Sequence, residues 1–341
     1  MEIVQLDPRT APATDLAGWH HVLCAVMGHD LPDDPQPVLA DVVARLQYPS
    51  KKARWIQWLT RIDGRPAATC ELKLEHAPND ELGNIELAVA PELRRRGIGR
   101  ALLHEALQRL TAEQRHTVTA EVVAGTAGEP FAEVHGFARA LTEQRGILRP
   151  GDADAAELDA FVAVPDSYRL ERWVGQVPDE WVDSYAGAKT AMGDAPTGDL
   201  KWQPPTFDAA KWRDVEDMFN RRGQQMHIVV AAHEASARVA GLTEVMFSRI
   251  DPRRADQGDT VVVPEHRGHG LGLAMKADML RWLRAECPQI LEIQTWNAAS
   301  NVHMLAINDR LGSRRDRAWF EYQGDVATAL AACSEVTPAP G

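Results

Sequence analysis

The sequence has few cysteines and no long apolar run. Only four cysteines occur among 341 residues, without close spacing, so neither a disulfide framework nor a zinc site is indicated. No apolar run approaches the roughly 18 residues that a membrane span needs. The start, MEIVQLDPRT, lacks the basic and apolar regions of a signal peptide. We therefore expect a soluble, cytoplasmic protein.

Basic residues are the scarcer charge. The chain has 37 Lys and Arg against 49 Asp and Glu, which gives a net charge of −12. Nucleic acids and anionic membranes both favour a basic surface, so neither is expected as a partner. The histidines form no HxxxH or HxH pair with nearby acids, and we expect no metal. The 45% apolar and 25% charged residues are typical of globular proteins, and the length suits two domains.

The sequence contains one long internal repeat. At a constant offset of 173 residues, the segment 85–110 matches the segment 260–283, and Glu71 falls on Glu244. A chance apolar helix would not keep one register across a strand, a turn and a helix. We therefore interpret the chain as two copies of one unit. It is not a solenoid, because stable solenoids need several short repeats.

Both copies have the same expected order of elements. Beta-branched runs bounded by turn residues indicate strands, and apolar residues at three- and four-residue steps indicate helices. Helices that interrupt a mostly antiparallel sheet predict the α+β class. We expect an N-terminal domain over 1–150, a linker with a small helix over 151–167, a C-terminal domain over 168–330 and a flexible tail over 331–341.

A glycine-rich turn joins a strand to a helix in each copy. Glycines let backbone N–H groups approach a ligand closely, and the following helix points its positive N-terminus at the same place. Arg94–Arg96 in the first copy, and Arg267 with two histidines in the second, add positive charge. A pyrophosphate fits such a site. The alternative, a merely tight turn, is weakened because the pattern occurs twice in register. The P-loop and Rossmann fingerprints are absent.

The motif Arg-x-x-Gly-x-Gly, over residues 94–99 and 267–272, resembles motif A of the GNAT superfamily of acyl-CoA N-acyltransferases. The segment 294–314 resembles the strand and helix that follow this motif. The chain is thus similar to tandem GNAT proteins over both halves. The resemblance implies two GNAT-like domains, each a mixed, mostly antiparallel sheet flanked by helices, with acyl-CoA as the ligand.

The resemblance also implies how acyl-CoA lies. Backbone amides of the motif would hold the pyrophosphate, and the preceding strand would bind the pantetheine arm as a false strand. In the second copy these residues are Val261, Val262, Val263, Arg267, Gly268, His269, Gly270, Leu271 and Gly272. In the first copy they are Leu87, Val89, Arg94, Arg95, Arg96, Gly97, Gly99 and Arg100. Asn297, also a catalytic candidate, and Asn301 resemble polar residues that contact the pantetheine arm and the acceptor side.

Acyl transfer from a thioester to an amine needs a base, an oxyanion donor and a proton for the thiolate. A carboxylate on a central strand can serve as the base. Glu244 is the first candidate and Asp259 the second, with Glu71 and Glu86 at the equivalent positions. The oxyanion donor is expected to be a strand amide near Val262. An exposed hairpin acid, or a salt bridge shared by both copies, is the alternative explanation for the acids.

The resemblance fails at the general acid. Many GNAT enzymes carry a tyrosine four residues before the glycine that ends the last helix, whereas this chain has Asn308 and Ala132 there. We take Tyr322, on the expected last strand, as the replacement candidate. Protonation of the thiolate by solvent is the alternative.

The expected function is acetyl-CoA-dependent N-acetyl transfer to the primary amine of a small molecule, mainly in the C-terminal domain. That copy keeps Asn297 and Asn301, whereas Gly and Pro interrupt the segment 124–137 of the first copy. Two alternatives stay open. One is a non-acetyl donor or malonyl-CoA decarboxylation, and the other is a non-catalytic acyl-CoA-binding scaffold. A monomer and a homodimer both fit.

Overall fold

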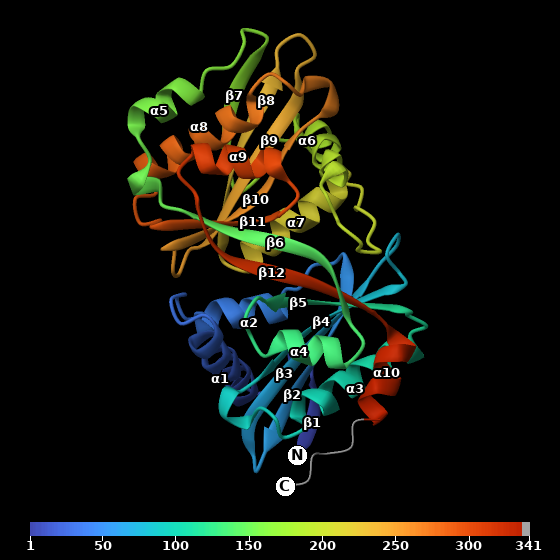
Figure 1. The fold of residues 1–341 in the computed structure, drawn as a ribbon. Coiled ribbons are helices and arrows are strands. Elements are labelled where there is room, and N and C mark those ends of the chain that lie inside the picture. The colour runs from blue at the N-terminus through green and yellow to red at the C-terminus, as the bar shows by residue number, and fades with distance from the viewer. Residues whose placement is uncertain (336–341) are drawn as a thin grey trace. The chain divides into compact units, whose positions relative to one another are not determined.

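The computed structural model describes residues 1–335, which form two compact units (Figure 1). Unit 1 consists of residues 1–142, 198–202 and those from 318 onward, and unit 2 of residues 143–197 and 203–317. Each unit is a mostly antiparallel sheet with helices on both faces. The α+β class that the sequence predicts is confirmed.

Unit 1 contains a sheet in the order β1-β2-β3-β4-β5-β12. The strands are β1 (Glu2–Leu6), β2 (Ala53–Ile62), β3 (Arg65–Glu75), β4 (Leu82–Val89), β5 (Thr117–Val123) and β12 (Arg314–Asp325). The helices are α1 (Ala13–Asp30), α2 (Leu39–Gln47), α3 (Ile98–Ala112), α4 (Gly128–Val134) and α10 (Val326–Glu335). Among these neighbours only β4 and β5 run parallel.

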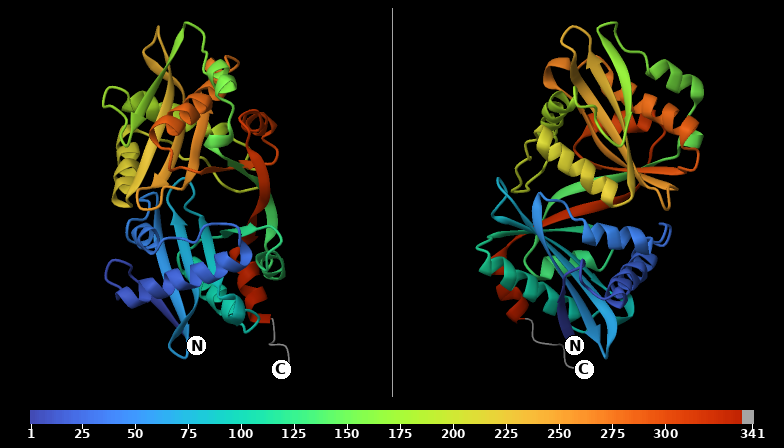
Figure 2. Two further views of the ribbon diagram at one scale, coloured as in Figure 1. Left: turned by 90° about the vertical axis from the view of Figure 1, so that its left-hand side faces the viewer. Right: turned by 180° about the vertical axis from the view of Figure 1, so that it is seen from behind.

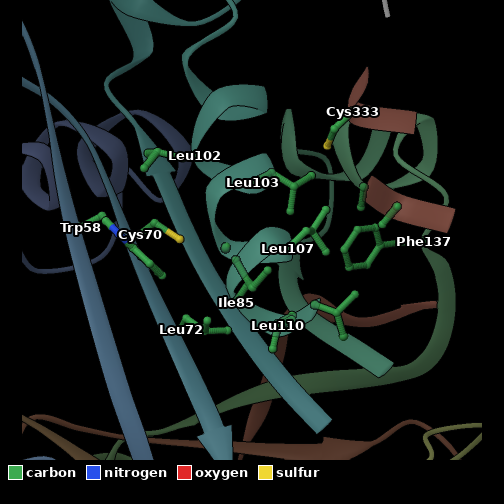
Figure 3. Packing of buried hydrophobic residues seen from close by; sticks show 14 of the residues in the cluster. Trp58, Cys70, Leu72, Ile85, Leu102, Leu103, Leu107, Leu110, Phe137 and Cys333 are labelled. Atoms are coloured by element: carbon green, nitrogen blue, oxygen red, sulfur yellow. The ribbon is translucent and has the colours of Figure 1, made fainter. Parts of the chain in front are cut away.

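The strands of unit 1 bury side chains on both faces of the sheet. Helices α1 and α2 cover one face of this sheet and α3 covers the other (Figure 2). Because successive side chains of a strand alternate, Leu59 packs in the cluster of α1 and α2, while its neighbour Trp58 packs in the cluster of α3. The leucines of α3 lie among Cys70, Ile85 and Phe137 (Figure 3). Such a sheet, covered on two sides, explains why the central residues of β2 and β3 are buried without a break.

Unit 2 repeats this plan, with the strand order β6-β11-β10-β9-β8-β7. The strands are β6 (Ala138–Leu148), β7 (Tyr168–Val174), β8 (Gln224–His233), β9 (Arg238–Ser248), β10 (Arg254–Val262) and β11 (Glu292–Ala298). The helices are α5 (Ala155–Phe161), α6 (Val182–Thr190), α7 (Ala209–Arg221), α8 (Leu271–Glu286) and α9 (Val302–Arg310). Two apolar clusters place α6 and α7 on one face of the sheet and α5, α8 and α9 on the other.

The two copies of the repeat exchange their last strands. Residues 143–148 of β6 pair with β11 in unit 2, whereas residues 319–325 of β12 pair with β5 in unit 1. The expected domains, 1–150 and 168–330, are continuous stretches of the chain. The compact units are not, because each includes strand residues from the other copy. Each sheet is completed by a strand from the other copy of the repeat.

The segment expected as a linker, 151–167, contains α5, whose Leu158 is buried in the core of unit 2. Of the expected tail, residues 331–335 belong to α10, and residues 336–341 lie outside the described part. Within residues 1–335, no helix has both the length and the apolar character required to cross a bilayer.

The strand exchange predicts that a fragment cut at the apparent end of the first copy is unstable. Fragment 1–150 lacks β12, so the edge of β5 over Thr117–Val123 loses its partner. We expect this fragment to lose cooperative urea unfolding, followed by circular dichroism. The same fragment ending at residue 142, with residues 318–335 joined by a flexible linker, should regain it. Fully cooperative unfolding of fragment 1–150 would show that β6 replaces β12 there and contradict the expectation.

Candidate functional site

The parallel strands of each unit separate soon after they meet. In unit 2, β10 and β11 pair only from Arg254 with Glu292 to Asp256 with Gln294. In unit 1, β4 and β5 pair over three residues in the same way. Beyond these pairs, no strand among residues 1–335 lies beside the second edge of β10. An extended ligand can therefore bind there as an additional strand.

Beyond the end of β10, the chain turns into α8 through an exposed loop. Gly268 and Gly270 have φ of 82° and 74°, and the space where a Cβ would lie is empty at both. Gly270 is the N-cap residue of α8. The first N–H groups of a helix have no partner inside the helix, and they carry its partial positive charge. The loop can therefore bind an anion, as the sequence predicts for Gly268–Gly272.

The arginine of the motif supports the loop in both units. Arg267 donates Nε to the carbonyl of Val262 at 3.1 Å and forms an ion pair with Asp194. Arg94 donates Nε to Val89 at the same distance and pairs with Asp30. In both units the guanidinium is thus held by a carboxylate. The backbone amides of the loop, rather than these arginines, are the groups directed at an anion.

Only alternate residues of β10 offer their backbone to the gap. Val263 N–H donates to Ala240 of β9 at 2.9 Å, so Val263, and by alternation Val261, face β9. Val262 faces the gap between β10 and β11. Of the three expected backbone contacts, the structure therefore supports Val262. By the same alternation, the contacts expected in unit 1, Leu87 and Val89, both face the gap, because Ala90 N–H donates to Ala67.

A β-bulge distinguishes unit 2 from unit 1. The pairing of β10 with β9 shifts between Gln257 and Thr260, so that two residues of β10 lie opposite Glu244. A Cβ on Gly258 would approach Glu244 Oε2 to 2.8 Å, so glycine is needed there. In unit 1 the corresponding strands pair without a shift. The bulge brings Asp259 to the rim of the gap.

Glu244 and Asp259 share one buried lysine. Lys189 of α6 contacts Glu244 Oε2 and Asp259 Oδ2, each at 2.6 Å. Tyr185, one turn earlier on α6, donates its hydroxyl to Glu244 Oε1. Burial alone would lower the pKa of Lys189, but the two carboxylates raise it above its ordinary value. Glu244 is buried, whereas 36% of the Asp259 side chain is exposed.

Unit 1 contains a related ion pair. Arg45 of α2 binds the buried Glu71 at 2.6 Å and lies 3.9 Å from Glu86. Gln57 donates to the second oxygen of Glu71 at 3.1 Å. Both repeated glutamates thus form a buried salt bridge, which agrees with the alternative explanation. Of the two candidate bases, the exposed Asp259 rather than Glu244 can reach a ligand.

Comparisons with known proteins agree with this geometry. Residues 22–137 match the Acetyltransferase (GNAT) family. A tandem GNAT protein from the clavulanic acid biosynthesis pathway, solved without AcCoA, is 27% identical to the chain, with a TM-score of 0.80. The match covers 95% of this chain and 98% of that one. The chain therefore has the tandem GNAT fold, and its segment 22–137 matches the acetyltransferase family.

Two more distant structures share the fold. A GCN5-related N-acetyltransferase from Sphaerobacter thermophilus is 15% identical, with a TM-score of 0.68, over 95% of this chain and 96% of that one. A putative acetyltransferase from Pyrococcus horikoshii is 13% identical, with a TM-score of 0.57, over 95% and 89%. No curated protein matches the chain.

The asparagines expected to contact the donor have partners within unit 2. Asn301 is the N-cap of α9, and its side chain accepts from Met304 N–H. Asn297 accepts from the side chain of Asn308 at 2.7 Å. Asn308, which replaces the usual tyrosine, is itself 4% exposed. The side-chain oxygens of both expected asparagines thus already accept a hydrogen bond within the protein. Asn297 lies on β11 beside the gap.

Tyr322 does not belong to the site of unit 2. It lies on β12 opposite Ala120 in unit 1, is fully buried, and donates to Glu133 at 3.1 Å. The tyrosine that contacts the candidate acids is Tyr185. Burial first, and then the charge of Glu244, raise the pKa of Tyr185 well above its ordinary value. Its spacing of four residues from Lys189 on a helix is the signal that could have identified both.

A small cavity, lined mostly by apolar side chains, lies on the α8 face of unit 2, where β10 and β11 begin to separate. Its polar lining consists of Gln257, Lys276, Thr295, Asn308 and Ser313. Lys276 of α8 is 5% exposed and donates to Gln257 Oε1 at 2.8 Å. Burial lowers its pKa to about 7. Lys276 is not among the site residues predicted from the sequence, although the repeat pairs it with Leu103.

Removing one partner of the acid cluster should destabilise unit 2. Lys189→Met leaves Glu244 buried without its cation, and we expect a loss of about 3–5 kcal/mol in the free energy of unfolding. Urea unfolding monitored by tryptophan fluorescence measures this. The double variant Lys189→Met, Glu244→Leu should recover most of the loss, because no buried charge is left unpaired. Equal instability of both variants would argue against an ion-pair effect.

Replacing the buried lysine should stabilise the protein. The pKa of Lys276 is about 7 in the folded state against an ordinary 10.5, so burial of the charge opposes folding. The cost is complete below pH 7 and disappears as the pH rises from 7 to 10.5, because the unfolded chain alone binds the proton in that range. We expect Lys276→Leu to add roughly 2–5 kcal/mol at pH 6, and less at pH 9. A gain independent of pH, measured by urea unfolding, would contradict this origin.

Proposed function

We propose that unit 2 transfers an acyl group from acyl-CoA, acetyl-CoA in the simplest case, to the primary amine of a small molecule. The supporting observation is the bulge of β10, which places Asp259 beside the gap between two separated strands. The anion-binding loop Gly268–Gly272 lies just beyond the same strand. Donor binding, acceptor binding and the base therefore converge on one strand.

The residues of unit 2 suit an acyl-CoA. The amides of the loop and the N-terminus of α8 would hold the pyrophosphate. Val262 would pair its backbone with the pantetheine arm along the gap. The loop carries His266 and His269, in a chain whose net charge is −12.

The acidic cluster suits the acceptor. A primary amine is a cation at neutral pH, and the exposed carboxylate of Asp259 attracts it. Asp259 Oδ2 is held by Lys189, which fixes the carboxylate, while Oδ1 has no hydrogen bond within residues 1–335. Asp259 Oδ1 accepts the proton that the amine must lose before attack. Glu244 and Tyr185 position Lys189 and act through it.

The reaction is a direct transfer. The amine, which has given one proton to Asp259, bonds through its nitrogen to the thioester carbon. The carbon–sulfur bond then breaks, and the second proton of the nitrogen is released to solvent. The thiolate takes its proton from solvent, since Asn308 stands where a tyrosine would donate one and Tyr185 is engaged with Glu244. Asn308 therefore favours protonation of the thiolate by solvent rather than by Tyr322.

Unit 1 serves as a second acyl-CoA-binding unit or as a scaffold. It keeps the separated strands and the loop, with Arg95 at a φ of 67° where unit 2 has Gly268. It lacks the bulge beside its acids. The second unit is therefore the better candidate for catalysis.

The two substrate sites can be tested separately with amine-panel kinetics and calorimetry on acetyl-CoA. Asp259→Asn should lower kcat about 10²–10³-fold and leave the affinity for acetyl-CoA unchanged. Gly270→Val should abolish donor binding in unit 2, because a branched residue does not tolerate a φ of 74°. Gly175→Val, at a φ of 75° in open space after β7, is the matched control and should retain turnover.

The opposite pattern would move catalysis to the other unit. If Glu86→Gln removed turnover and Asp259→Asn did not, unit 1 would be the catalytic unit. If acetyl-CoA produced no heat with the unaltered protein, the assignment to acyl-CoA would fail.

A further inference from the structure

A buried cation without a carboxylate partner lies at the inner end of the gap in unit 2. Among residues 1–335, Lys276 forms no ion pair, and its hydrogen bond goes to a neutral amide, that of Gln257. Buried charges are normally paired, because an unpaired one is costly. The low pKa of Lys276 reflects this lack of a partner. The missing counter-charge points to an anionic ligand group.

The position of the cavity identifies which part of a ligand reaches it. The cavity is lined by Gln257 and Thr295, each within one residue of the last pair between β10 and β11. The loop lies beyond the other end of β10, about 20 Å away along six strand residues. An arm that starts with its pyrophosphate on the loop and runs along Val262 ends near this cavity. Its terminal group is the acyl group.

The two faces of the sheet in unit 2 carry different groups. Thr243 and Val245 point to the α8 face, where the cavity lies, whereas Glu244 points to the α6 face with Lys189. The acceptor amine and the base thus occupy one face of the sheet. The far end of the acyl group extends to the other.

We propose that the donor of unit 2 carries an acyl group with a terminal carboxylate, as in succinyl-CoA, and that Lys276 binds this carboxylate. The proposal rests on the proposed function and narrows its donor class. The hydroxyls of Thr295 and Ser313 add hydrogen-bond donors in the same cavity. The bond that forms and the bond that breaks are those of the direct transfer, with a dicarboxylic acyl group in place of acetyl.

Unit 1 offers the comparison. The repeat places Leu103 at the position of Lys276, and Leu103 is packed in the apolar core. A cation is therefore not required by the helix or by the sheet that it covers. The proposal applies to unit 2 alone.

The test compares two donors of equal chain length on the full chain. Succinyl-CoA and butyryl-CoA differ only in a carboxylate in place of a methyl group. By calorimetry we expect one site with at least tenfold higher affinity for succinyl-CoA. Lys276→Leu, which installs the residue of unit 1, should remove this preference and leave the affinity for CoA unchanged. Lys276→Gln provides a second variant that keeps a polar side chain.

The outcomes separate the inference from the function on which it rests. If CoA and butyryl-CoA bind and succinyl-CoA binds no better, the inference fails while the proposed function stands. If none of the three binds, both fail. Intact-mass spectrometry after incubation provides a further check. A succinyl group attached to Lys276 would show that the amine is acylated instead of binding the carboxylate, which overturns the inference.

Discussion

The site of unit 2 depends on the close approach of the β10 backbone to the side chain of Glu244. Gly258 permits this approach, because any Cβ there would collide with Glu244. The extra residue turns Asp259 toward Lys189, and Gln257 reaches back to the carbonyl of Glu244 at 2.6 Å. The buried ion pair therefore fixes the local geometry. Without it, β10 could pair regularly with β9, as β4 pairs with β3 in unit 1.

The two units share their supporting ion pairs but differ in the polar residues beside the gap. Both units tie the loop to an aspartate through an arginine, and both bury a glutamate, on β3 in unit 1 and on β9 in unit 2, against a cation from a helix, α2 in unit 1 and α6 in unit 2. The polar chemistry beside the gap differs. Unit 2 has the bulge and a lysine in the cavity, whereas unit 1 has regular pairing and Leu103. The shared ion pairs explain why the two copies keep one register. The different polar residues beside the gap explain why one copy can act differently from the other.

The sequence predicts what is local and repeated. The offset between Glu71 and Glu244, and the glycines before α8, gave the strand, turn and helix of each unit. The strand exchange was not predictable, because β6 and β12 pair with strands far from them in the sequence, Glu292–Ala298 and Thr117–Val123. The partner of Arg267 is Asp194, 73 residues away, a contact that no local pattern encodes. Lys276 was accessible to sequence reasoning, since a lysine at an apolar helix position stands out against Leu103.

Stability and function oppose each other at Lys276. A leucine would fill the same position of α8 at no electrostatic cost, as unit 1 demonstrates, so selection for stability alone would remove the lysine. The cost is offset only when an anion enters the cavity, because the ion pair then restores the favourable charge state. A residue that opposes folding in the free protein and favours a bound state belongs to a ligand site. The same reasoning separates it from Lys189, whose charge is already neutralised by Glu244 and Asp259 and which therefore serves the fold.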